Sequence, residues 1–99
     1  MDFKVVFTET FCCDLEDILE HIAAHDPMAA RRLGDRVIDM CEALSFFPER
    51  YPKVRSRPNI RRIVVGKYYK VFYRIKQGDR VVEILRLWDG RRGSNPHFS

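Results

Sequence analysis

Positively charged and aromatic side chains are interleaved in the second half of the sequence and are its clearest candidates for chemistry. Arginine and lysine neutralise phosphate groups and aromatic rings stack on unpaired bases, so the mixture suits single-stranded RNA better than a duplex groove. An acidic polypeptide is an equally suitable ligand, and a third reading is that the cations only solubilise a sheet or pair with a helix. The cations are Arg61, Arg62, Lys67, Lys70, Arg74, Arg86, Arg91 and Arg92, with Tyr68, Phe72 and Trp88 between them.

His21 and His25 are one helical turn apart, and Asp17 precedes them by another turn, a spacing that can present three ligands to one metal ion. The segment HIAAH lacks the glutamate after the first histidine that metalloproteases use as general base. A solvated helix face is the usual explanation of such spacing. We therefore expect neither a metal nor a cofactor.

Nucleophilic chemistry has little support in the sequence. Cys12, Cys13 and Cys41 show no CxxC spacing, and an adjacent pair is poor geometry for a disulfide or a metal site, so we expect reduced, packed thiols. There is no GxxxxGK[ST] or GxGxxG phosphate loop and no GxSxG nucleophile elbow.

Charge divides the chain into two unlike halves. Residues 1–50 contain 5 Lys/Arg and 11 Asp/Glu, whereas residues 51–99 contain 13 Lys/Arg and 3 Asp/Glu, so the overall net charge of +4 hides a dipole. Such an excess of one sign favours a polyanion or an acidic partner.

The 99 residues suit a single domain spanning 1–99, long enough for one core. No apolar run approaches the roughly 18 residues that span a bilayer, and the first residues lack the order of a signal peptide. We expect a cytoplasmic protein without membrane contact.

The elements that position the cations follow from periodicity. Residues 2–7 alternate as a strand, and Phe11, Leu15, Ile18 and Ile22 form the stripe of a helix that ends near residue 25. Asp26-Pro27 is an N-cap followed by proline, so a second helix begins at once, and a proline-rich loop over 48–59 ends it. Three β-rich segments follow at 60–65, 68–76 and 80–88, and predict an α+β fold, β-α-α-β-β-β, with a helical hairpin on one face of a mainly antiparallel sheet.

If Gly78-Asp79 is a two-residue turn, Arg74 lies opposite Glu83, and alternation sorts the side chains onto two faces. Only the tail after Trp88 remains to cover the second, basic and apolar face, so this face predicts a partner. The face that receives the helices would hold Tyr69, Val71, Tyr73, Ile75, Val82, Ile84, Arg86 and Trp88. The second would hold Lys70, Phe72, Arg74, Lys76, Val81, Glu83, Leu85 and Leu87.

Short phrases along the chain carry a family resemblance. They are DLEDI at 14–18, DPMAAR at 26–31, LSFFP at 44–48, IRR at 60–62, YKVFYRI at 69–75 and ILRLWDGRR at 84–92. In this order and spacing they resemble the RelE/ParE toxin superfamily, also called plasmid stabilisation proteins, over nearly the whole chain. The resemblance implies a growth-arresting toxin neutralised by an antitoxin whose C-terminal segment wraps it. RelE-like members cleave mRNA in the ribosomal A site, whereas ParE-like members poison DNA gyrase.

For the RelE-like activity, the resemblance implies catalytic roles for Lys70, after the third-strand tyrosine, and for Arg91. Arg61 and Arg62 would take the place of the two lysines that RelE-like members carry on the preceding strand. The C-terminal tyrosine of that pattern is missing here, and His97 lies near its expected position. Arginine stays charged and is a poor proton acceptor, so such a set should cut RNA badly. Arg74 and Arg86 complete the candidate catalytic set.

The opening of the second helix and the long helical hairpin look more like ParE. We therefore predict a toxin that blocks DNA gyrase by binding; the alternatives are a ribosome-dependent endoribonuclease and a non-toxic binding module. A homodimer or a toxin–antitoxin heterotetramer is the expected assembly. The predicted partner-binding residues are Lys70, Phe72, Arg74, Leu85, Leu87, Arg91 and Arg92.

Overall fold

The computed structural model describes residues 2–98 and contains two helices and five strands. A helical hairpin, α1 (Glu9–Ala23) and α2 (Pro27–Glu42), follows the first strand, β1 (Lys4–Phe7). Two single-turn 3-10 helices, η1 (Ala43–Ser45) and η2 (Pro48–Arg50), lead to the remaining strands. These are β2 (Lys53–Val54), β3 (Arg57–Val65), β4 (Tyr69–Lys76) and β5 (Val81–Asp89), followed by η3 (Gly90–Arg92). The predicted α+β architecture is confirmed.

The two helices begin where their capping residues stand. The Thr8 hydroxyl accepts a hydrogen bond from the backbone N–H of Phe11, and the Asp26 carboxylate accepts one from Ala29 with Pro27 at the first helical position. The Thr8 hydroxyl also donates to the carbonyl of Ile84 at 2.8 Å. The start of α1 is therefore attached directly to β5.

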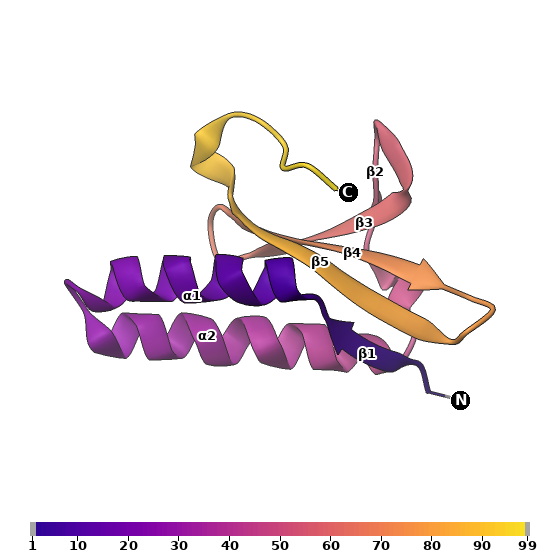
Figure 1. Ribbon diagram of the computed structural model, residues 1–99, viewed down its shortest axis with the longest axis horizontal. Helices are drawn as coiled ribbons and strands as arrows, with labels where there is room; N and C mark the ends of the chain where they lie inside the picture. Colours follow the sequence, from indigo (N-terminus) through magenta and orange to yellow (C-terminus); the bar gives the residue numbers. More distant parts are fainter. Residues whose placement is uncertain (1, 99) are drawn as a thin grey trace.

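The sheet order is β1-β5-β4-β3-β2, and every neighbouring pair is antiparallel except β1 and β5. Figure 1 shows α1 and α2 side by side along one side of this sheet, with the C-terminal tail beyond the other. The short strand β2 lies within the segment predicted to be a loop, and β3 begins three residues before the predicted strand. No helix among residues 2–98 has the length and apolar character needed to cross a bilayer.

The predicted register of the β4–β5 hairpin is confirmed near the turn, where Arg74 pairs with Glu83 and Tyr73 with Ile84. Beyond this point Phe72 pairs with Arg86, because a bulge adds one residue to β5. An extra residue reverses the direction of every later side chain. The predicted faces of Arg86, Leu87 and Trp88 were therefore wrong.

The main core lies between the helices and the sheet. It contains Phe11, Val37 and Tyr73 at zero exposure, together with Leu87, which had been predicted for the other face. Cys41 is also buried there, and burial raises the pKa of its thiol to about 12. Cys12 and Cys13 are exposed, so the expectation of packed thiols holds only for the third cysteine.

A second, smaller apolar cluster occupies the opposite face. Val54, Ile60 and Phe72 are buried in it, because Phe98 of the C-terminal tail packs edge-on against the ring of Phe72 at 5.1 Å between centroids. Leu85 and Trp88 flank this cluster. The prediction of an uncovered face was therefore wrong in its centre, where the tail of the chain itself seals it.

Candidate functional site

The candidate site is a cleft of about 370 Å³ between α1 and the C-terminal end of β5. Pairing between β1 and β5 ends at Phe7 and Ile84, whereas β5 continues to Asp89. The edge of the last part of β5 therefore faces α1 instead of another strand. The cleft is lined by Asp14, Asp17, Ile18 and His21 of α1 and by Tyr69, Arg86, Leu87, Trp88, Asp89, Arg91 and Arg92.

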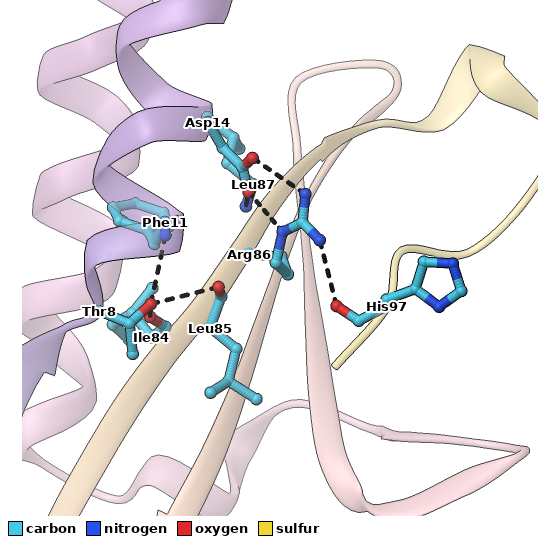
Figure 2. A network of polar contacts seen from close by, with 8 residues as sticks. All are labelled: Thr8, Phe11, Asp14, Ile84, Leu85, Arg86, Leu87 and His97. Carbon is cyan, nitrogen blue, oxygen red and sulfur yellow. Dashed lines mark hydrogen bonds and ion pairs between the residues drawn. The ribbon is translucent and has the colours of Figure 1, made fainter. Parts of the chain in front are cut away.

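Asp14 satisfies this edge. One of its oxygens accepts a hydrogen bond from the backbone N–H of Leu87 at 3.1 Å, and its carboxylate receives two more from Arg86, at 2.7 Å from Nε and 3.0 Å from Nη2. The third guanidinium nitrogen, Nη1, donates to the carbonyl of His97 (Figure 2). The hydrogen bond with Asp14 raises the pKa of Arg86. Arg86 thus joins α1, β5 and the tail.

Arg91 is held in a similar way by its neighbour Asp89. Its Nε and Nη2 lie 2.9 Å and 2.6 Å from the two carboxylate oxygens, and its guanidinium stacks 4.0 Å from the centroid of the Tyr68 ring. The hydrogen bond from Arg91 lowers the pKa of Asp89. Between them, Gly90 is required, since a Cβ there would lie 2.4 Å from the carbonyl oxygen of Tyr68.

Trp88 is the centre of the exposed end of the site. The guanidinium groups of Arg86 and Arg92 lie 5.6 Å and 4.8 Å from its ring centroid, and its indole N–H donates to the carbonyl of Ser94 at 2.6 Å. The predicted proximity of arginine and aromatic side chains is therefore present. We call the group Asp14, Arg86, Trp88, Asp89, Arg91 and Arg92 the arginine cluster.

The other predicted catalytic cations lie elsewhere. Arg74 forms an ion pair with Glu83, whose Oε1 accepts hydrogen bonds from Nη2 at 2.7 Å and from Nε at 3.0 Å, and it lies about 13 Å along β4 from Lys70. Arg61 donates to the backbone carbonyls of Glu49 and Tyr51. The structure thus brings together Lys70, Arg86 and Arg91 but separates Arg61 and Arg74 from them.

His97 lies beside Arg86 through its backbone, but Figure 2 shows its ring directed away from the guanidinium. Lys70 pairs with Trp88 across the sheet, and its Cε is next to Gly90. Lys70 and His97 are the two predicted catalytic residues that could exchange a proton. Both therefore lie near the arginine cluster, but no hydrogen bond joins their side chains within residues 2–98.

The predicted partner-binding residues differ in exposure. Phe72 is buried beneath Phe98, and Leu87 is in the main core, so neither presents its side chain at the surface. Leu85, Lys70 and Arg74 are partly exposed, whereas Arg91 and Arg92 are exposed.

Asp14 is the residue that sequence reasoning missed. It appeared only within the phrase DLEDI at 14–18, and helical periodicity does not tell which acid of a helix meets a strand edge. The available signal was the difference in length between a four-residue first strand and a nine-residue last strand. The His21 and His25 rings are 6.1 Å apart, and residues 2–98 contain no group of three His, Cys, Asp or Glu side chains arranged for a metal ion.

Solved structures with the same architecture define the class of protein. A chain of the chromosomal ParDE toxin–antitoxin system from P. aeruginosa superposes with a TM-score of 0.74 and 17% identity, covering 88% of this chain and 95% of that one. A chain of the RelBE2 toxin–antitoxin complex from Mycobacterium tuberculosis gives 0.64 and 25%, covering 90% and 99%. An arginine-to-alanine double mutant of E. coli RelE in the free state gives 0.56 and 14%, covering 93% and 87%. The fold is that of the RelE/ParE toxin superfamily.

None of the curated proteins matches the sequence. The family described as "ParE toxin of type II toxin-antitoxin system, parDE" matches residues 5–93. The chain therefore belongs to the ParE toxin family of type II toxin–antitoxin systems, which confirms the resemblance.

Proposed function

We propose that this toxin arrests growth by binding and blocking DNA gyrase in the cytoplasm, without cleaving RNA. One observation carries this proposal: four of the cations that would have to act in RNA cleavage are already engaged within the chain. Arg86 is paired with Asp14, Arg74 with Glu83 and Arg91 with Asp89, while Arg61 is bound to backbone carbonyls.

An engaged guanidinium is poorly placed for catalysis. To stabilise a phosphate in the transition state, Arg86 or Arg91 would have to leave a carboxylate that already binds it in a bidentate geometry. Arg74 would have to leave the carboxylate of Glu83, and Arg61 its backbone carbonyls. Guanidinium groups also do not accept protons, and cleavage at a ribose 2′-OH requires a proton acceptor within hydrogen-bond reach. Only Lys70 and His97 of the predicted set can exchange protons, and the ring of His97 points away from the guanidinium of Arg86. This arrangement favours binding over RNA chemistry.

The partner that neutralises the toxin is a cognate antitoxin with an acidic segment. The similar chains from P. aeruginosa and M. tuberculosis belong to toxin–antitoxin systems, and the second half of this chain carries 13 Lys/Arg against 3 Asp/Glu. We assign the contact to Lys70 and Arg92, where positive charge remains at the surface, and to Arg91, whose side chain is 58% exposed although it is paired with Asp89. Phe72 would be reached only after the tail moves, and a toxin–antitoxin heterotetramer is the assembly that we expect.

Two purified assays test the proposal. The chain should inhibit supercoiling by DNA gyrase and should leave mRNA in the ribosomal A site intact, and the antitoxin should relieve the inhibition. Lys70→Ala combined with Arg91→Ala should keep the inhibition. A-site cleavage that this double variant abolishes would instead identify an endoribonuclease, and absence of growth arrest on expression would identify a binding module of the same fold.

A further inference from the structure

Two adjacent phenylalanines are exposed where the helical half joins the sheet. Phe46 and Phe47, between η1 and η2, expose 62% and 68% of their surface, more than is usual for large apolar side chains. The surrounding residues are ordered by the fold, because Ser45 accepts a hydrogen bond from Phe3 and Pro48 is buried. The pair therefore projects from a fixed loop, residues 46–51, which we call the phenylalanine loop.

The backbone of this loop is strained at its apex. Phe47 has φ +46° and ψ +62°, the left-handed region that a bulky side chain rarely adopts. Strain of this kind persists only where the surrounding structure enforces it, and it is concentrated at functional sites. An exposed phenylalanine in this conformation contributes nothing to the core that would explain it.

Two arginines and one tyrosine enforce the conformation. Arg50 donates to the carbonyls of Ala43, Phe46 and Phe47 at 3.1 Å, 2.6 Å and 3.2 Å. The buried Tyr73 hydroxyl donates to the carbonyl of Pro48 at 2.5 Å, and Arg61 donates to those of Glu49 and Tyr51. Arg61, a candidate for catalysis in the sequence, thus holds this loop. The backbone that carries the two rings is therefore held in place before any partner binds.

We infer that Phe46 and Phe47 are the anchor with which the toxin docks into an apolar pocket on gyrase; this rests on the function proposed above. Rigid aromatic side chains lose little conformational entropy on binding and dominate interface energetics. Projecting rings need a preformed concave acceptor, which a folded enzyme possesses and a segment that folds only on binding does not. The antitoxin segment instead needs a groove on the toxin.

The position of the phenylalanine loop agrees with two separate binding regions. The loop adjoins β1 through Phe3 and Ser45, and β1 lies towards the right of Figure 1. The cleft beside the arginine cluster is lined by the part of α1 from Asp14 to His21. Figure 1 shows α1 running to the left, away from β1. A partner bound at the cleft would leave the two rings accessible.

The test is a double variant, Phe46→Ser with Phe47→Asn, in the full chain. Asparagine tolerates the left-handed conformation, so the loop keeps its backbone. Met28→Ser is the matched control, because Met28 is 62% exposed in the first turn of α2, at the opposite end of this helix from the phenylalanine loop. We expect the double variant to require at least about tenfold more toxin for half-inhibition of gyrase supercoiling, whereas the control and the affinity of both variants for the antitoxin stay within about twofold of wild type.

Any other result would refute either the role of the two phenylalanines or the proposed function. Inhibition equal to wild type by the double variant would refute the anchor while leaving the proposed function intact. An equal loss of antitoxin affinity would assign the rings to the antitoxin. Failure of the wild-type toxin to inhibit gyrase would refute the proposed function, and the anchor with it. Thermal melting of the variants identifies a loss due to unfolding; in that case the single variant Phe46→Ser, which leaves Phe47 unchanged, decides by the same tenfold criterion.

Discussion

The arginine cluster and the phenylalanine loop differ in composition and in which of their side chains have partners within the chain. In the arginine cluster, Asp14 and Asp89 neutralise two of the three guanidinium groups by bidentate contacts. In the phenylalanine loop, the polar groups are satisfied by Arg50, Arg61 and Tyr73, and the apolar rings are exposed.

This difference shows that a region rich in charged side chains is not necessarily the region that is available to bind a partner. A cation that bridges elements of its own chain stabilises the fold, whereas an exposed aromatic pair on an enforced backbone is available to a partner. The strongly basic half of the sequence therefore contains many of the side chains that hold the fold together, and the acidic half contains the most exposed large apolar side chains.

Substitution of Asp14 is expected to have the largest effect, and it tests whether the arginine cluster stabilises the fold. Asp14→Ala leaves Arg86, whose side chain is only 20% exposed, without its carboxylate and leaves the N–H of Leu87 without its acceptor. We expect a loss of about 2–3 kcal/mol of unfolding free energy, which corresponds to a melting temperature lower by about 10–20 °C. Calorimetry or urea denaturation measures it.

Asp17→Ala is the control, because Asp17 is an exposed acid one turn along the same helix, and it should change stability by less than about 0.5 kcal/mol. Equal effects of the two substitutions on stability would contradict the claim that Asp14 stabilises the contact between α1 and β5. Combining Asp14→Ala with Arg86→Met should recover part of the loss, since the half-buried charge is then absent as well.

Tyr73→Phe tests the support of the phenylalanine loop with a smaller change. The variant keeps the buried ring but deletes the hydrogen bond to the carbonyl of Pro48, so we expect a loss of about 1 kcal/mol. Because the loop also loses one of its restraints, gyrase inhibition should weaken as well. Denaturation and supercoiling assays measure the two effects, and unchanged stability would show that this hydrogen bond does not hold the loop.

The pair of Asp89 and Arg91 gives the smallest effect and depends on pH. Arg91 lowers the pKa of Asp89 in the folded protein, so the ionised carboxylate stabilises the fold above its unfolded pKa of about 3.9. This contribution is lost as the pH falls through the lower folded value. Since Arg91 is exposed, solvent screening keeps this contribution small.

The measurement compares wild type with Asp89→Asn between pH 7 and pH 2. The difference in their unfolding free energies should be largest at neutral pH and should shrink below about pH 4. A difference that grows towards acidic pH would have the wrong sign and would contradict the assigned ion pair.

Much of the fold was predictable because local patterns agreed with the tertiary structure. The apolar stripe from Phe11 to Ile22 and the cap at Asp26 placed the two helices, and the turn at Gly78-Asp79 fixed the register as far as Tyr73. The bulge beside Leu85 was not predictable from alternation, because both Leu85 and Leu87 are apolar and either can face the core. The faces of Arg86 and Trp88 were misassigned for the same reason.

The functional surfaces were less predictable than the fold. The sequence indicated the basic and aromatic residues, but not their partners. Arg61 bonds to a loop 10 to 12 residues earlier, and Arg86 to Asp14 of α1, 72 residues earlier. Phe46 and Phe47 were recognised only as part of the phrase that ends the second helix. Their exposure and the positive φ of Phe47 belong to a loop conformation that no periodic pattern reports.

The central claim is that the aromatic pair, and not the cations, carries toxicity. The most direct measurement is half-inhibition of gyrase supercoiling by Lys70→Ala/Arg91→Ala and by Phe46→Ser/Phe47→Asn, measured side by side with antitoxin affinity. We predict opposite outcomes: the cation variant inhibits like wild type but binds the antitoxin more weakly, and the phenylalanine variant does the reverse. Loss of inhibition by the cation variant with full inhibition by the phenylalanine variant would contradict the account.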